Sequence, residues 1–144
     1  MPMPSPADPN PQCWSYDLGN GWTALAGKTA ADNECLSLRV AHPEDFWFHV
    51  AGQPGSHVIL RRPADAPDAV PDKALLTSAA AIAAWHSKAR QGGVCSVSCT
   101  RAKFVGKLRG APPGTVSISH ERILRVRPAL PVQQNRNSPA GPPE

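Results

Sequence analysis

The residues best suited to chemistry in this sequence are cations spaced along a single segment. Arg101, Lys103, Lys107 and Arg109 occupy odd-numbered positions among apolar or small residues. Because successive side chains of a β-strand point to opposite faces, an extended strand here would place all four cations on one surface. Such a row of positive charge suits the phosphates of a polyanion. The spacing therefore predicts a polyanion-binding strand.

A second cationic cluster falls near the expected end of a helix, in the segment AAWHSKARQGG (83–93). It contains Trp85, His86, Lys88 and Arg90. An aromatic ring beside cations suits RNA, since bases stack on the ring and phosphates pair with the cations. Structural roles compete with this one. Trp85 can anchor the core, and the two cations suit the negative end of the helix dipole.

The segment DFWFHVAGQPGSHVIL (45–60) contains a turn of small residues. Backbone N–H groups of this turn, together with the side chains of Ser56 and His57, can form an anion-binding nest. The alternative is a tight hairpin in which Gly55 meets a steric demand and Ser56 caps the turn. Spacing alone favours this alternative.

Histidines and cysteines offer a further kind of site. His49 and His57 lie eight residues apart on strands expected to be adjacent, and with Cys95 or Cys99 they would resemble a zinc site. No closely spaced ligand pair supports this, so we expect no metal and no other cofactor. Ser56 lacks the Gly-x-Ser-x-Gly elbow of a hydrolase, and no glycine-rich nucleotide loop occurs. We therefore expect no enzyme; the alternative is a small metal-dependent or hydrolytic one using these residues.

Charge is distributed unevenly along the chain. Residues 1–72 carry four Lys/Arg and nine Asp/Glu, a formal −5, whereas residues 73–144 carry eleven and two, a formal +9. Between Lys88 and Arg127, nine basic residues face only Glu121. Such a field attracts polyanions, and RNA is the commonest one in the cytoplasm. The alternative is a basic surface that serves solubility alone.

Length and composition fit one folded domain. The chain has 144 residues, of which 41% are hydrophobic and 18% charged, which argues against full disorder. No apolar run approaches the roughly 18 residues of a membrane helix. The first residues also lack the basic and apolar regions of a secretory signal. We therefore expect a cytoplasmic protein whose four cysteines are reduced.

The ends of the chain differ from its middle. Residues 1–11 and 128–144 each contain five of the seventeen prolines. Segments with many prolines and few apolar residues cannot recover the entropy lost on ordering. We expect both to be flexible tails around a folded domain at 12–127.

Alternation and turn residues predict a mostly antiparallel sheet. Gly19-Asn20-Gly21 is a good hairpin turn between strands 13–18 and 22–26. Bulky residues on both faces of 46–51 make that strand central. Further strands are expected at 36–41, 57–61, 94–100, 103–109, 115–119 and 122–127.

One main helix is expected at about 73–90. Asp72 can cap its start, apolar residues recur at spacings of three and four, and Gly92-Gly93 can end it. Residues 28–36 are ambiguous and can form a short helix. The predicted class is α+β.

Four stretches, in order, cover nearly all of residues 16–127: GWTALAGKTAADNECLSL (21–38), DFWFHVAGQPGSHVIL (45–60), AAWHSKAR (83–90) and T-x3-FV-x-K-x2-GAPPGTV (100–116). Together they resemble the NFACT RNA-binding module, NFACT-R. The Asp-x-Trp-x-His pattern followed by Pro-Gly-Ser-His-Val is long and specific. Positions that match the family pattern are Asp45, Trp47, His49, Pro54, Gly55, Ser56, His57, Ser87, Lys88, Thr100, Lys107, Gly110, Pro113 and Gly114.

The resemblance also shows one departure, at Gly106, where relatives often carry a basic residue. In full-length relatives the module accompanies an N-terminal domain, paired helix-hairpin-helix elements and a coiled coil. Those proteins bind the large ribosomal subunit and tRNA in ribosome-associated quality control and extend stalled chains. The resemblance covers the module alone, so it implies RNA binding without chain elongation.

Charge and resemblance together predict a non-catalytic module for tRNA or rRNA in translation or ribosome quality control. Its candidate partner is the large ribosomal subunit, and no membrane is expected. The alternative is a protein-interaction module whose basic face docks on a ribosomal or quality-control protein. The predicted RNA-contact residues are Lys88, Arg101, Lys103, Lys107, Arg109, Ser56, His57, Trp85, His86 and Arg90.

Overall fold

The computed structural model describes residues 10–131. Within them, a six-stranded sheet has the order β1-β2-β4-β3-β5-β8, and β6 and β7 form a separate pair. All strand pairs are antiparallel, which confirms the predicted α+β class. The strands are β1 Cys13–Gly19, β2 Trp22–Gly27, β3 Phe46–Val50, β4 Val58–Arg61, β5 Cys95–Arg101, β6 Val105–Lys107, β7 Val116–Ile118 and β8 Arg122–Val126. The helical segments are α1 Ala30–Cys35, η1 Leu36–Val40, α2 Lys73–Trp85 and η2 Ala102–Phe104.

The predicted hairpin between β1 and β2 is confirmed. Asn20 has φ 54° and Gly21 φ 88°, the left-handed conformation that Asn and Gly tolerate. Pairing runs from this turn back to Cys13 opposite Gly27. The register therefore places Trp14 at the end of the sheet where β2 finishes.

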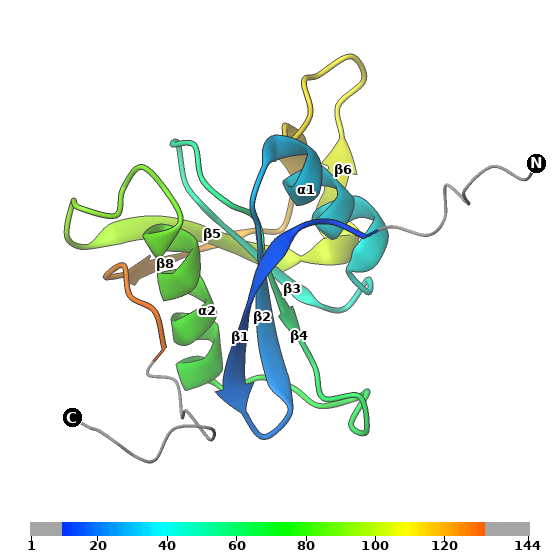
Figure 1. Cartoon of the computed structure of the whole chain (residues 1–144), viewed down its shortest axis with the longest axis vertical. Helices are drawn as coiled ribbons and strands as arrows, with labels where there is room; N and C mark the ends of the chain where they lie inside the picture. The colour runs from blue at the N-terminus through cyan, green and yellow to red at the C-terminus, as the bar shows by residue number, and fades with distance from the viewer. Residues whose placement is uncertain (1–9, 132–144) are drawn as a thin grey trace, which may run out of the picture.

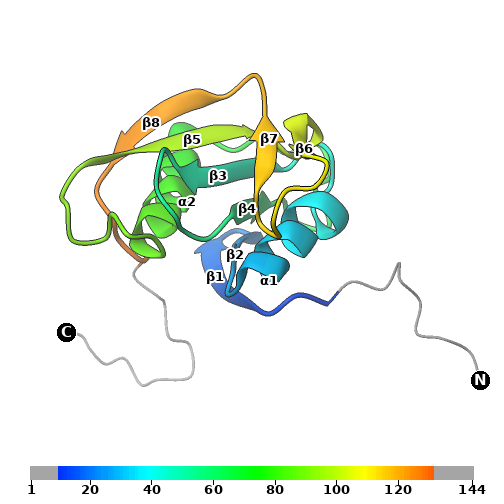
Figure 2. The same ribbon diagram turned by 90° about the horizontal axis from the view of Figure 1, so that it is seen from above.

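Strand β3 is central, as its two bulky faces predict, and separates two apolar clusters. Phe48 and Val50 pack in the larger cluster with α2, and the sheet curves around this helix (Figure 2). Trp47 packs on the opposite face in a smaller cluster that includes Leu36 of η1. Helical segments therefore cover both faces of the sheet. Among residues 10–131, no helix is long and apolar enough to cross a membrane.

Helix α2 begins where predicted but ends earlier. The Asp72 carboxylate accepts the Leu75 N–H at 2.8 Å, so the expected N-cap is present. The helix stops at Trp85, five residues before the predicted end. The Ser87 hydroxyl donates to the Ala84 carbonyl, which competes with the helical pattern. Residues 86–88 then pair with the turn that follows β3.

Two predicted strands are wrong. Residues 36–41 continue the helical path from α1, because a helical turn buries both Leu36 and Ser37 against the sheet. A short apolar run is consistent with either structure. Residues 103–109 are broken into η2, the three-residue β6 and a turn. The predicted short helix within 28–36 is present as α1, with Thr29 and Asp32 forming a reciprocal cap.

The predicted tails fall mostly outside the described residues. Residues 1–9 and 132–144 are not described. Near the C-terminal boundary, the Ala129 N–H donates to the Ala81 carbonyl of α2 at 3.2 Å. The chain therefore still contacts the fold two residues beyond the predicted domain end.

Candidate nucleic-acid interface

An open groove of about 480 Å³ is lined by four segments: the start of β1, the β2–α1 connection, the turn after β3 and the segment following α2. Figure 1 shows β1 and β2 side by side, with α1 beyond the end of β2. Side chains and backbone from all four segments form the walls of the groove. The lining residues that matter here are Trp14, Lys28, Gly55, His86, Lys88 and Arg90.

Stacked aromatic rings form one wall of the groove. The indole of Trp14 and the imidazole of His86 are nearly parallel, at 11°, with centroids 4.1 Å apart. The Tyr16 hydroxyl is hydrogen bonded to His86 Nε2 at 2.7 Å, which fixes the imidazole from its other side. Burial, with a smaller effect of Arg90, lowers the pKa of His86, so the stack is uncharged at neutral pH. Trp14 is 38% exposed and therefore keeps an accessible ring.

Three cations surround this stack. The Lys28 ammonium lies 5.4 Å from the Trp14 ring centroid. The Arg90 guanidinium lies 4.6 Å from the Trp85 ring centroid, and its Nε donates to the Trp85 carbonyl. The Lys88 side chain is exposed. None of these three cations forms an ion pair with a carboxylate in the described part of the chain.

The family-like Pro-Gly-Ser-His turn holds this wall in place. The Ser56 N–H donates to the His86 carbonyl at 2.9 Å, and the Lys88 N–H donates to the Pro54 carbonyl at 3.1 Å. A Cβ on Gly55 would lie 2.7 Å from the Ser87 Cβ, so only glycine permits this approach. The turn thus positions His86 and Lys88 through its backbone.

The side chains of this turn are buried within the fold. The Ser56 hydroxyl donates to the Gly27 carbonyl at 2.6 Å, and the His57 N–H donates to Asn33 Oδ1 at 3.0 Å. Because the N–H groups of both residues bind protein acceptors, they are not free to hold an anion. These hydrogen bonds favour the structural alternative for the turn over the anion nest.

His57 lies in a buried hydrogen-bonded chain. Trp47 Nε1 donates to the Ser37 hydroxyl at 2.8 Å, and that hydroxyl lies 2.7 Å from His57 Nδ1. The indole N–H leaves the Ser37 hydroxyl free to donate, so Nδ1 is the acceptor. The ring also forms a hydrogen bond to the Gly114 backbone. Burial lowers the pKa of His57 to about 4.

The predicted histidine pair is present, but its cysteine partners are not with it. The His49 and His57 rings lie 5.3 Å apart with edge-to-face geometry. His49 pairs with Ser98 across the β3–β5 ladder, which places Cys99 on the opposite face of the sheet. Cys99 packs in the cluster around α2. The fold therefore does not assemble the proposed His/Cys zinc ligands.

The four predicted cations do not share one strand face. Arg101 ends β5, Lys103 lies in η2, Lys107 ends β6 and Arg109 lies in the following turn. Three of them pair with carboxylates from the acidic half of the chain. Arg101 and Lys103 lie 3.0 Å and 2.8 Å from Glu44 oxygens, and Lys107 lies 2.7 Å from Glu34 Oε1.

These ion pairs perturb both carboxylates. The hydrogen bond from Lys103 lowers the pKa of Glu44, and the one from Lys107 lowers the pKa of Glu34. Glu34 also accepts the Gly114 N–H at 3.0 Å. The charge excess counted along the sequence is thus partly cancelled by contacts between distant segments.

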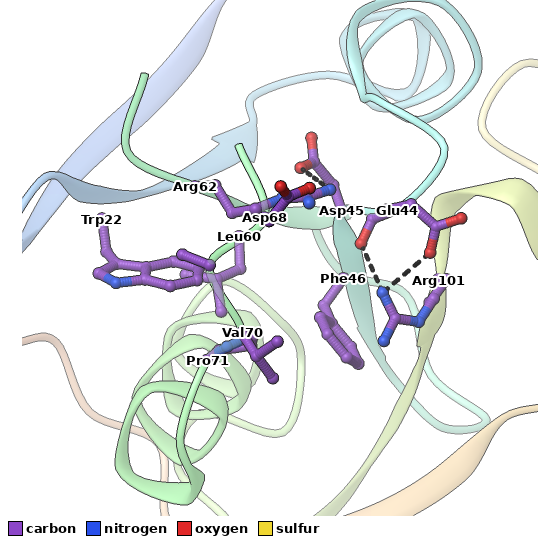
Figure 3. Close-up of a pocket in the computed structure, with 11 residues that line it drawn as sticks. Trp22, Glu44, Asp45, Phe46, Leu60, Arg62, Asp68, Val70, Pro71 and Arg101 are labelled. Atoms are coloured by element: carbon purple, nitrogen blue, oxygen red, sulfur yellow. Dashed lines mark hydrogen bonds and ion pairs between the residues drawn. The ribbon is translucent and has the colours of Figure 1, made fainter. Parts of the chain in front are cut away.

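A smaller pocket of about 180 Å³ near Trp22 illustrates the same neutralisation (Figure 3). Arg101 donates to both the carbonyl and the carboxylate of Glu44 in this pocket. The buried Asp45 carboxylate lies 3.8 Å from the Arg62 guanidinium. Because its cations already have carboxylate partners, this pocket is a weaker candidate for phosphates than the groove.

The groove also contains two residues that the sequence analysis missed, Trp14 and Lys28. Trp14 lies near the start of β1 and Lys28 directly follows the end of β2, so the two residues are far apart in sequence and no local motif joins them. The register of that hairpin is the one available signal, because it pairs Trp14 with Ala26, two residues before Lys28.

Comparison with known families matches residues 14–120 to the NFACT protein RNA binding domain. The chain belongs to the NFACT RNA-binding domain family. This NFACT-R domain is 37% identical over 119 residues to the Rqc2 homolog RqcH of Bacillus subtilis, and 35% identical over 114 residues to the Streptococcus pneumoniae RqcH. These matches cover 83% and 78% of this chain but only 20% of each relative.

A solved structure resembles the whole described fold. It is the C-terminal part of the fibronectin/fibrinogen-binding protein from Streptococcus suis. The TM-score is 0.72 at 33% identity, covering 83% of this chain and 45% of that one. The sequence-based resemblance to NFACT-R is therefore confirmed.

Proposed function

We propose that this NFACT-R domain binds structured RNA, tRNA or rRNA, without catalysing a reaction. Its setting is cytoplasmic translation or ribosome-associated quality control, with the large ribosomal subunit as a partner. The matched family, described as an RNA-binding domain, and the Rqc2-homolog relatives support this proposal. Because the chain spans about a fifth of those relatives, chain elongation is not included.

The observation that carries the proposal is the aromatic stack with its three cations. Trp14 offers an exposed ring supported by His86. Lys28, Lys88 and Arg90 offer positive charge and form no ion pair with a carboxylate in the described part of the chain. Single-stranded and looped RNA binds to such combinations through base stacking and phosphate pairing.

The remaining predicted residues have supporting or peripheral roles in this proposal. Ser56 lines the groove and donates to the Gly27 carbonyl, whereas His57 lines the adjoining cleft and its N–H donates to Asn33. Arg101, Lys103 and Lys107 are already paired with Glu44 or Glu34, which weakens their attraction for phosphates. Arg109 is exposed and is available for a contact at the edge of the interface.

The test is tRNA binding by fluorescence anisotropy at several salt concentrations. Three phosphate contacts predict a slope of log affinity against log salt of about −2 to −3. The double variant Lys28→Ala/Lys88→Ala removes two exposed charges from the groove and makes the slope shallower by about 1.4 to 1.8. Its matched control, Lys73→Ala/Arg127→Ala, removes two exposed charges elsewhere and keeps the wild-type slope. Equal slopes for the two double variants would contradict the groove model.

A protein-interaction role is the second candidate, because the similar solved chain is named for binding fibronectin and fibrinogen. The two functions separate in one competition experiment. If the groove binds RNA, unlabelled tRNA displaces labelled tRNA, and an acidic protein at equal charge concentration does not. Displacement by the acidic protein alone would favour the interaction module.

A further inference from the structure

A second cleft adjoins the groove. It has a volume of about 530 Å³ and is lined by β3, the turn after β3 and the segment 113–118 that contains β7. Figure 2 shows the ribbons of β3 and β7 near one another. The two hollows share Ala30, Asn33, Pro54 and Gly55 as a common wall. The two hollows are therefore neighbours, and one extended ligand can occupy both by passing over this wall.

The lining of the cleft contains no charged side chain. The walls come from glycine, proline and apolar residues, including Val116 and Ile118, together with a few uncharged polar groups. Phosphate would lose its hydration there without meeting a cation. An uncharged, flat and partly polar group fits better. A nucleobase has this chemistry.

Two polar groups in the cleft are available to such a ligand. Ser98 is 8% exposed, and its hydroxyl has no hydrogen-bond partner within residues 10–131. His49 lies opposite it across the β3–β5 ladder. One ring nitrogen of His49 bonds to the Gly55 backbone, which leaves the other as an acceptor in the neutral ring. Burial lowers the pKa of His49, which keeps that ring neutral at physiological pH.

Aromatic neighbours hold His49 at this position. Its ring stacks on Trp47 at 5.9 Å, and the His57 ring contacts its edge. His57 is in turn fixed by Ser37 and Gly114. The acceptor on His49 is thus held by the fold before any ligand binds, which lowers the entropic cost of binding.

We propose that this cleft binds one unpaired nucleobase of the RNA whose phosphates lie along the groove. Ser98 and His49 form hydrogen bonds to the edge of the base, and Val116 and Ile118 pack on it. The inference rests on the proposed function and adds a substrate preference. RNA with an unpaired nucleotide at this point binds more tightly than a fully paired duplex.

The test compares labelled single-stranded decauridylate with a blunt ten-base-pair RNA duplex. Ser98→Ala removes one hydrogen bond and weakens decauridylate binding about three- to tenfold. Thr115→Tyr places a ring at the exposed rim of the cleft and weakens it more than tenfold. Duplex binding by both variants equals that of wild type. The matched controls are Ser96→Ala on the same strand and Ser117→Tyr on β7; neither residue lines the cleft, and neither variant changes binding.

The possible failures can be told apart. If Lys28→Ala/Lys88→Ala weakens decauridylate binding while Ser98→Ala and Thr115→Tyr bind it like wild type, the cleft inference is wrong and the RNA-binding groove stands. If wild type binds neither of these RNAs but binds tRNA, the cleft inference is wrong and the proposed function stands; if it does not bind tRNA either, the proposed function is wrong as well. Because the Ser98 hydroxyl bonds to no described residue, Ser98→Ala should fold normally, and circular dichroism checks this.

Discussion

Acidification should destabilise this domain through His57, because the fold holds that imidazole uncharged. The His57 residue is only 3% exposed, and its ring is hydrogen bonded to the Ser37 hydroxyl. Burial lowers its pKa to about 4, against the ordinary value of 6.5. Below pH 6.5 the unfolded chain takes up a proton that the folded chain refuses. Stability is therefore unchanged above pH 6.5 and falls as the pH decreases toward 4.

The size of this effect follows from the two pKa values. A shift of one pKa unit corresponds to about 1.4 kcal/mol, so protonation of His57 lowers the free energy of unfolding by about 3 kcal/mol at pH 4 and by slightly more well below it. About 2 kcal/mol of it is already lost at pH 5. The total stability of a small domain is roughly 5–15 kcal/mol, so this loss is readily measured. Lowered pKa values at His49 and His86 add to it in the same direction.

Urea unfolding at pH 7, 6 and 5 measures the loss in wild type and in His57→Gln. The variant is less stable at every pH, because it breaks the hydrogen bonds to Ser37 and Gly114. Its free energy of unfolding nevertheless decreases less steeply as the pH is lowered. Direct titration of the His57 ring by NMR provides a readout that does not depend on the variant folding. A His57 pKa near 6.5, or equal pH slopes for the two proteins, would refute the reasoning.

Other predictions concern the turn, the helix cap, the tails and metal content. Gly55→Ala lowers the melting temperature by several degrees because its Cβ would lie 2.7 Å from the Ser87 Cβ, whereas Gly92→Ala, whose Cβ would lie 3.4 Å from the Ala89 carbonyl oxygen, costs less. Asp72→Ala removes the N-cap of α2 and costs about 1 kcal/mol in urea unfolding, while Asp72→Asn retains most of the stability. Removing residues 1–11 and 132–144 barely changes the melting temperature; a large drop would show that a tail packs on the fold. Elemental analysis of purified protein finds less than one zinc per chain, and a stoichiometric amount would revive the metal-site alternative.

Local sequence patterns predicted the elements whose structure depends on nearby residues. The Gly19-Asn20-Gly21 turn fixes its hairpin through backbone conformation, and alternation identifies β3 as central. The end of α2 depends instead on hydrogen bonds to a turn some thirty residues earlier. The residues 83–90 alone contain no signal of that partner.

In the candidate site, too, local sequence patterns predicted some residues, and others depend on contacts with distant segments. The cluster after α2 was found from its sequence, because aromatic and basic residues are adjacent there. Trp14 joins it only through the hairpin register and the stack on His86. The basic strand was predicted wrongly because the segment is broken into η2, β6 and a turn. Alternation also says nothing of Glu34 and Glu44, which pair with three of its cations from far away in the chain.

Site-mapped crosslinking tests the groove most directly. The 144-residue chain is irradiated with tRNA containing 4-thiouridine, and the crosslinked peptides are identified by mass spectrometry. The groove predicts crosslinks on the segment around Trp14 and on residues 85–90, both lost in Lys28→Ala/Lys88→Ala. Crosslinks confined to residues 101–109 or to β8, with none in the groove, would contradict it.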